Sequence, residues 1–458
     1  MDRSLGWWSI VRLGIVQAAL GAIVVLTTST LNRVMVVELA LPAILPGALV
    51  TLHHAMQLLR PRMGHGSDSR RRKTPWIAGG MVVLALGGVG AAVSTAVLAS
   101  HFALGLALAV ASFALIGGGV SAAGTSLLVL MAQRVPSQRR AASATVVWLM
   151  MIAGFAITAT TAGKLLDPFS PTRLVQVAAG ISGVALVAAL LAVWGVEGRE
   201  GVAEEKAEEG PKASFRDALR QVWSEPDARR FTLFVFVSML AYSAQDLVLE
   251  PFAGAIYAFT PGASTKLSGT QHAGVFVGML LVAVMTSILK GTRFASLKGW
   301  VVGGCAASGA AMIGLVLAGV RGGGWALKEN VFVLGVANGV FSIAAIGSMM
   351  SLASQGVKSK EGMRMGLWGA AQAIAFGAGG FAGTVVVDLA KRVVGPTGAA
   401  YAVVFALEAV GFFVAQWLAL SISFPSHVNA ADAGGAEPRE RDVRVVPSMT
   451  AVQSRETV

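Results

Sequence analysis

The chain contains a succession of apolar stretches, each about 20 residues long, separated by short segments that carry most of its charge. An α-helix rises about 1.5 Å per residue, so about 20 apolar residues cross the roughly 30 Å hydrocarbon core of a bilayer. Hydrophobic side chains make up 55% of the 458 residues and charged ones only 13%. Soluble domains carry about 25% charged residues, so the sequence predicts an all-α integral membrane protein.

Twelve such stretches are found, in two groups of six. They span residues 10–31, 40–60, 75–98, 102–132, 141–164 and 172–195, then 231–256, 271–290, 299–320, 329–354, 365–391 and 397–424. We therefore expect a first six-helix half (1–195), a cytoplasmic linker (196–230), a second six-helix half (231–424) and a disordered cytoplasmic tail (425–458).

The positions of the cations predict the orientation of these spans. Short connections on one side of the membrane are rich in Lys and Arg, whereas those on the other side contain fewer of these residues. The basic connections are those between spans 2 and 3, 4 and 5, 8 and 9, and 10 and 11. Because basic loops stay in the cytoplasm, both termini should be cytoplasmic, in a bacterial inner membrane.

The two halves resemble each other at a nearly constant offset. Gly119 and Trp148 recur as Gly339 and Trp368, each 220 residues later in the chain. The interval from the glycine to the tryptophan is therefore the same in both halves. A duplicated six-span unit is typical of the major facilitator fold, so we expect that fold here.

Several other classes of protein are disfavoured. The only cysteine, Cys305, lies in an apolar stretch, which excludes an intrachain disulfide and a cysteine-based metal site. The net charge of +12 belongs to topology signals in the loops, so nucleic-acid binding is not expected. No nucleophile with a base, set of metal ligands or phosphate loop is recognisable, so an enzyme is not expected.

The linker divides into an acidic part and an amphipathic part. Residues 197–210 are rich in Glu and should be solvated. Ser214 with Asp217 then resembles a capping box, and apolar residues up to Trp223 recur at helical spacing. This predicts a helix on the membrane surface, with docking of a partner as the alternative.

The connection between spans 2 and 3 resembles the signature loop of the major facilitator superfamily. Gly64 permits a tight turn, Asp68 can accept hydrogen bonds at a helix start, and basic residues hold the loop at the membrane face. These basic residues are Arg71, Arg72 and Lys73. Arg71 replaces the second glycine of the motif, so a purely topological basic loop remains an alternative.

Ionisable residues within the spans are functional candidates, because burying charge in lipid is costly. Glu408 lies near the middle of span 12, and Asp246 and Glu250 lie in the outer part of span 7. Spans 4 and 5 have no acid in their middles, which disfavours a proton-driven drug exporter. For Glu408 we weigh a structural carboxyl, protonated or hydrogen-bonded, against a coupling role.

Two adjacent histidines in span 2 are candidates for pigment binding. His53, His54 and Gln57 form a polar stripe within reach of one another. A neutral imidazole can ligate the magnesium of a chlorin ring, and His272 is a weaker candidate. The alternative is a histidine that is hydrogen-bonded to a neighbouring helix.

Span 11 carries a continuous face of small residues at intervals of four. The face consists of Ala371, Ala375, Gly379 and Gly383. Such faces allow helices to pack closely in lipid. We expect it to mate with another span of this chain, with docking of a foreign helix as the alternative.

The first two spans are joined by an unusually apolar block that carries one cation and one anion. It reads Leu31-Asn32-Arg33-Val34-Met35-Val36-Val37-Glu38-Leu39. This block resembles the Leu-Asn-Arg-Val-Met-Ile-Val-Glu-Leu segment of the PucC/LhaA, or bacteriochlorophyll delivery, family of the major facilitator superfamily. In outline the resemblance extends from residue 5 to about residue 424.

The resemblance implies a role in purple-bacterial photosynthesis. It implies assembly of light-harvesting complexes, in which the protein either hands bacteriochlorophyll, bound as cargo, to newly inserted antenna polypeptides or shields those polypeptides. Bacteriochlorophyll synthase, the membrane insertion machinery and membrane lipids are the implied partners. A secondary transporter of a small amphipathic solute is the alternative, since the fold does not define the cargo.

The same block predicts a closure point between the halves. Arg33 and Glu38 are five residues apart, and that spacing does not align side chains on an α-helix. We therefore expect Arg33 to meet Asp246 or Glu250 instead, clamping the halves at the outer face.

Overall fold

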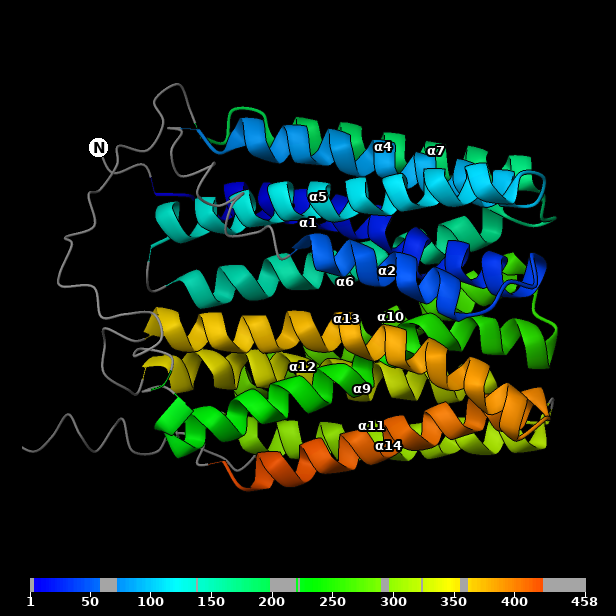
Figure 1. Ribbon diagram of the computed structural model, residues 1–458. Helices are drawn as coiled ribbons and strands as arrows, with labels where there is room; N and C mark the ends of the chain where they lie inside the picture. The colour runs from blue at the N-terminus through cyan, green and yellow to red at the C-terminus, as the bar shows by residue number, and fades with distance from the viewer. Residues whose placement is uncertain are drawn as a thin grey trace, which may run out of the picture. The chain divides into compact units, whose positions relative to one another are not determined.

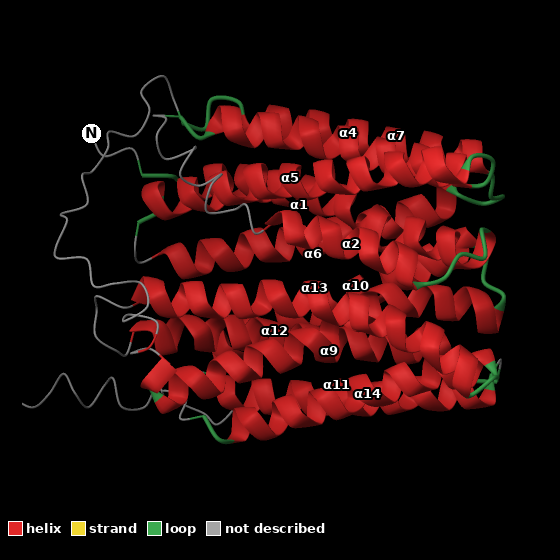
Figure 2. Ribbon diagram, in the orientation of Figure 1, coloured by secondary structure: helices red, strands yellow, loops and turns green. Residues whose placement is uncertain are grey.

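A computed structural model describes residues 4–57, 72–136, 139–197, 220, 223–289, 296–322, 324–354 and 361–422. Within those residues the chain is helical and contains no strand (Figure 2). In this described part of the chain, eleven helices are long and apolar enough to cross a membrane. The protein is therefore a multi-pass membrane protein.

Among its described residues, the first half holds six α-helices and two π-helical segments. They are α1 (Trp7–Val25), η1 (Leu26–Leu31), η2 (Val34–Glu38), α2 (Ile44–Met56), α4 (Thr74–Leu98), α5 (Phe102–Arg134), α6 (Arg140–Leu165) and α7 (Pro171–Val193). The second half holds α9 (Pro226–Tyr257), α10 (Pro261–Ile288), α11 (Leu297–Arg321), α12 (Leu327–Ser354), α13 (Glu361–Val393) and α14 (Thr397–Leu420). Figure 1 shows the two groups as an upper and a lower layer of lengthwise helices.

Most of the expected spans correspond to a helix, with two informative differences. The helix expected at 271–290 begins ten residues earlier, because the Thr260 hydroxyl accepts a hydrogen bond from the Ala263 amide at 3.1 Å and Pro261 occupies the first turn. The expected span 40–60 appears as the short helix α2, beyond which the described residues end at 57. The count of twelve spans and the cytoplasmic termini therefore stay predictions.

The first helix also continues beyond its expected end. Apolar helical structure runs from Trp7 to Glu38, through both π-helical segments. The Thr27 and Thr28 hydroxyls both donate to the Val24 carbonyl, at 2.7 and 3.3 Å, and so compete with the backbone for that acceptor. The block expected to join the first two spans is therefore part of the first helix.

The halves meet along three sets of helices. In the described residues, α6 packs on α10, α2 packs on α13, η1 packs on α9 and α10, and η2 packs on α9. Each half also has its own apolar core. Polar side chains that cross between the halves are therefore candidates for control of their separation.

Candidate functional site

Polar contacts between the halves gather at one end of the helices, where η2 ends and α10 begins. We call this the closed end. Asp167, after α6, accepts a hydrogen bond from the Thr260 hydroxyl at 2.9 Å and pairs with Lys266 at 3.4 Å. The backbone amide of Ile44, at the start of α2, donates to Asp388 of α13 at 2.9 Å. All three contacts join the first half to the second.

Asn32 completes the backbone hydrogen bonding of a helix in the other half. Pro251 lies inside α9 and has no N–H, so the Leu247 carbonyl, four residues earlier, loses its normal helical partner. The Asn32 side-chain amide donates to that carbonyl at 2.8 Å, and Asn32 is buried. A polar side chain from a neighbouring helix thus allows a proline inside a membrane helix.

Arg33 is 2% exposed and spans the same interface. Its Nη1 pairs with the Glu38 carboxylate at 2.5 Å, and its Nη2 donates to the Phe259 carbonyl, just beyond α9, at 2.5 Å. Gly254 provides the space, because a Cβ there would lie 2.9 Å from Nη2. Arg33 therefore joins the first half to the carboxyl end of α9, where partial negative charge favours a cation.

The expectation that Arg33 and Glu38 do not pair is wrong. The segment from Val34 to Glu38 is π-helical, and its i→i+5 hydrogen bonds bring residues five apart onto one face. Among the described residues Arg33 forms its ion pair with Glu38, whereas the expected pairing with Asp246 or Glu250 does not occur. The halves are joined through a backbone carbonyl instead.

Glu250 belongs to a buried group of hydroxyls at the same interface. Its carboxylate accepts hydrogen bonds from the Ser29 hydroxyl and, at 3.4 Å, from Thr265. The Thr30 and Thr265 hydroxyls lie 3.1 Å apart. We call Ser29, Thr30, Glu250 and Thr265 the hydroxyl cluster. In the sequence, the Thr and Ser residues of η1 indicate this cluster only weakly, because the residues that they contact lie more than 200 positions further along the chain.

A small cavity lies between the halves, beside the closed end. Its volume is about 20 Å³, enough for about one water molecule. Its lining comes from Thr28, Val50, His54, Ser243, Asp246, Leu247, Phe376 and Gly380. Asp246 and His54, predicted separately as site residues, thus line one space.

The predicted polar stripe of α2 forms a connected group. The Gln57 amide nitrogen lies 3.0 Å from His53 Nε2 and 3.3 Å from His54 Nδ1. The His54 ring also lies 6.0 Å from that of Phe376, across the cavity between the halves. His272 lies elsewhere, on α10, where its Nδ1 contacts the Ser268 carbonyl at 2.9 Å and Phe155 packs edge-on against its ring.

Two other predicted features, the small face of α13 and Glu408, are buried within the protein. On the small face of α13, Gly379 and Gly383 pack against α9, and the Ala375 carbonyl accepts a hydrogen bond from Ser243 at 3.2 Å. Ala371 is buried on the same face. Glu408 is buried in α14.

The signature loop and the linker lie largely outside the described residues. Gly64, Asp68, Arg71 and the capping box at Ser214 and Asp217 are not described. Arg72 and Lys73 are described, and the amides of Lys73 and Thr74 donate to the two oxygens of Glu197, at 2.8 and 2.7 Å. Glu197, expected to be solvated, is instead buried and caps α4, because carboxylates bind the free amides of a helix start.

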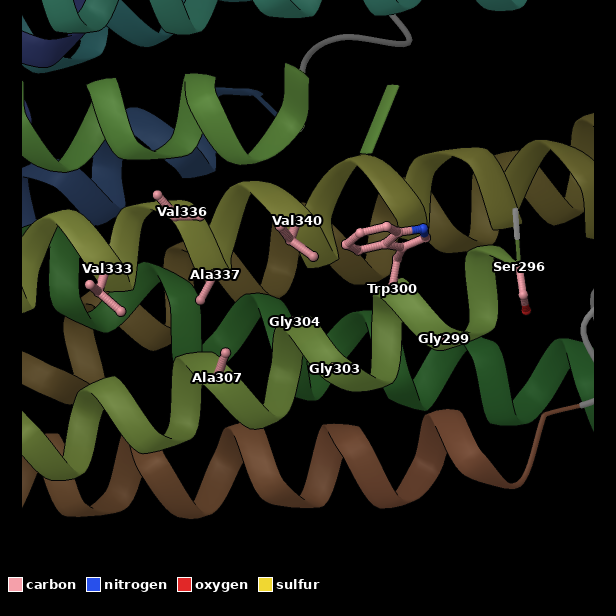
Figure 3. A pocket seen from close by; sticks show the side chains of 10 residues that line it. All are labelled: Ser296, Gly299, Trp300, Gly303, Gly304, Ala307, Val333, Val336, Ala337 and Val340. Carbon is pink, nitrogen blue, oxygen red and sulfur yellow. The ribbon is translucent and has the colours of Figure 1, made fainter. Parts of the chain in front are cut away.

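A second, larger hollow lies on the second half. A groove of about 530 Å³ runs between α11 and α12, and Figure 3 shows glycines of α11 facing valines of α12. Its lining is apolar apart from the Ser296 hydroxyl and the Trp300 indole nitrogen. A Cβ on Gly299 or Gly303 would meet nothing within 4 Å. On its other side, α12 packs Gly335 and Gly339 closely onto α10.

The arrangement of the helices is that of the major facilitator fold. The described helices match solved secondary transporters of the major facilitator type, including a D-xylose–proton symporter (TM-score 0.65, 13% identity, 89% of this chain and 97% of that chain). A bacterial homolog of the human lysosomal transporter Spinster matches similarly (TM-score 0.63, 13% identity, 91% and 98%). At such identities the likeness shows the fold alone.

The family follows from sequence. Residues 30–426 match the family model described as PUCC protein, so the chain belongs to the PucC family, as its apolar block predicted. It is 49% identical over 419 residues to the bacteriochlorophyll synthase 44.5 kDa chain of Rhodobacter capsulatus (92% of this chain, 96% of the relative). It is 28% identical over 435 residues to Protein PucC of Cereibacter sphaeroides (90% and 91%).

Proposed function

We propose that this protein is a non-enzymatic assembly factor that binds bacteriochlorophyll and delivers it to light-harvesting antenna polypeptides in the bacterial inner membrane. The observation that carries the proposal is the match to the PucC family over residues 30–426, together with 49% identity to a chain named for bacteriochlorophyll synthase. Bacteriochlorophyll synthase and the membrane insertion machinery are the expected partners beside the antenna polypeptides.

The cavity between the halves supports a binding site that forms only when the halves separate. A space of about 20 Å³ is far below the roughly 300–1,000 Å³ of ligand pockets, so it cannot hold a macrocycle in the closed state. His54 lines this cavity and supplies an imidazole of the kind that ligates magnesium. We therefore place the pigment at His54, with His53 and Gln57 positioning its ring, in a state with the halves apart.

A pigment measurement tests this placement. The protein is purified in mild detergent from pigmented cells, and near-infrared absorbance is compared with protein content. We expect bound bacteriochlorophyll in the wild type and a loss of most of it in His54→Ala, whereas His101→Ala, at an exposed site before α5, retains it.

Three results would count against the proposal or its placement of the pigment. A colourless wild-type protein with no co-purifying antenna or synthase polypeptide would refute pigment delivery. Unchanged pigment in His53→Ala and His54→Ala would remove the histidines from the site. Loss in His272→Ala alone would move the site to the interface of α6 and α10.

The second candidate function is secondary transport of a small amphipathic solute. Asp246 favours it, because this carboxyl lines the cavity between the halves and forms no hydrogen bond or ion pair among the described residues. Flux of a solute into vesicles that is lost in Asp246→Asn would support transport. Pigment binding without any such flux would leave delivery as the function.

A further inference from the structure

The contact between α9 and α14 places a glutamine opposite a glutamate inside the second half. At one end of this contact a Cβ on Gly411 would lie 3.0 Å from the Ala241 Cβ. At the other end the Phe252 ring lies 5.6 Å from Tyr401 and 5.1 Å from Phe405. The helices are therefore antiparallel, and counting between these contacts brings Gln245 level with Glu408.

Neither of these side chains has a hydrogen-bond partner among the described residues. Gln245 is fully buried and Glu408 is 4% exposed, and all four of their polar atoms lack a partner. Each unsatisfied buried group costs about 1–3 kcal/mol. An ionised carboxylate in the same surroundings costs far more, so a proton on Glu408 lowers the free energy of the folded protein.

The neighbouring helices supply no cation for Glu408 among the described residues. On α9, Asp246 adjoins Gln245, and the Tyr242 ring packs against Phe341 and Phe376. On α11, Gly309 contacts Phe413, so apolar residues lie level with Glu408, and Cys305 lies about two turns away. On α13, Asp388, Lys391 and Arg392 lie in the last turns, near the start of α14, where Lys391 is 5.3 Å from the Tyr401 ring centre. Arg364, at the other end of α13, pairs with Glu225.

Asp246 connects this interior to the space between the halves. It follows Gln245 directly in α9 and lines the cavity that His54 and Phe376 also line. Asp246 is therefore the carboxyl of this group that contacts the cavity.

We propose that Gln245, Asp246 and Glu408 form a proton-binding site in the second half, which exchanges its proton with the cavity between the halves. In the occupied state the neutral Glu408 carboxyl donates its O–H to the Gln245 side-chain oxygen and accepts from the Gln245 amide, after rotation of both side chains. In the transfer step the Asp246 O–H bond breaks and a Glu408 O–H bond forms, leaving Asp246 as the carboxylate. The reverse step returns the proton to the cavity.

Infrared difference spectroscopy of the full-length purified protein tests the site without any pigment. The carbonyl band of a protonated carboxyl is followed between acidic and alkaline buffer. We expect a band that decreases as pH rises, disappears in Glu408→Gln, and shifts in frequency in Gln245→Leu, which removes the carboxyl's partner and keeps the acid. The control Glu329→Gln, at the exposed start of α12, leaves the band unchanged.

The outcomes distinguish a Glu408 that exchanges its proton from one that keeps it at every pH. A band that keeps its amplitude at every pH, or that survives in Glu408→Gln, would overturn the proposal. Asp246→Asn should slow the response of the band to a pH jump, and an unchanged response would remove Asp246 from the route. Gel filtration of each variant checks folding, and the frequency shift in Gln245→Leu provides a test in which Glu408 itself is unaltered.

Discussion

At the scale of single residues, Asn32 is the clearest link between sequence and fold. Its amide replaces the N–H that Pro251 lacks, so two residues more than 200 positions apart form one structural unit. The pair explains why an asparagine lies in an otherwise apolar block. It also makes the stability of α9 depend on the first half of the molecule.

A double-mutant cycle measures this dependence. Asn32→Ala should lower the unfolding free energy by about 1–2 kcal/mol, because it leaves the Leu247 carbonyl without its partner. In a Pro251→Ala background the same change should cost less, since the introduced alanine restores the helical N–H. Thermal unfolding in detergent gives both values, and equal losses in the two backgrounds would contradict this role.

A second double-mutant cycle distinguishes the observed ion pair of Arg33 with Glu38 from the expected pair of Arg33 with Asp246. Arg33 and Glu38 are in contact, so their alanine variants should be non-additive by at least about 0.5 kcal/mol. Arg33→Ala and Asp246→Ala should be additive within that margin. The reverse pattern in unfolding measurements would restore the clamp predicted from the sequence.

The residues of the site could be predicted better than their partners. The apolar block, His54 and Asp246 were identified from residue type and position. The pairing of Arg33 was not, because it depends on a π-helical turn, and α-helical spacing was assumed. The acceptors of Asn32 and Arg33 are backbone carbonyls, and sequence patterns carry little information about those.

At the scale of elements, small residues on α13 allow this helix to pack closely against α9. A Cβ on Gly379 of α13 would overlap the Ser243 hydroxyl and the Leu240 carbonyl of α9. On the same helix a Cβ on Gly369 would meet nothing within 4 Å. The sequence predicted the small face but not which helix it contacts.

These two glycines provide a matched pair of substitutions. Gly379→Ala should destabilise the protein by about 1–3 kcal/mol, because α13 and α9 must move apart. Gly369→Ala should be neutral or stabilising by up to about 1 kcal/mol, since alanine favours the helix. Melting temperatures in detergent should therefore move in opposite directions, and parallel shifts would show that this contact is not tight.

At the scale of the whole molecule, the contacts of the closed end hold the two halves together. Contacts at the opposite end include several within a single half: the Leu5 amide binds the Arg134 carbonyl, and Arg364 pairs with Glu225. Separation of the halves at that opposite end would leave both of these contacts intact. The all-helical membrane fold is predictable from sequence, whereas the closed end is not, since it depends on contacts between distant residues.

Cross-linking the closed end tests whether its opening is needed for function. The Thr30 and Thr265 hydroxyls are 3.1 Å apart, so cysteines at these positions can form a disulfide. In a Cys305→Ala background, oxidation should abolish pigment delivery and reduction should restore it. Each single-cysteine variant serves as control, and full delivery by the oxidised double variant would show that this end stays shut throughout.

The π-helical segments have a consequence for how the length of this chain can vary. Each such turn holds one residue more than an α-helical turn, so deleting one residue from Leu26–Leu31 would return the segment to α-helical register. Everything downstream would then rotate by about 100°, carrying Asn32 and Arg33 away from Leu247 and Phe259. Relatives that keep this arrangement should tolerate substitutions in the segment far better than a change of even one residue in its length.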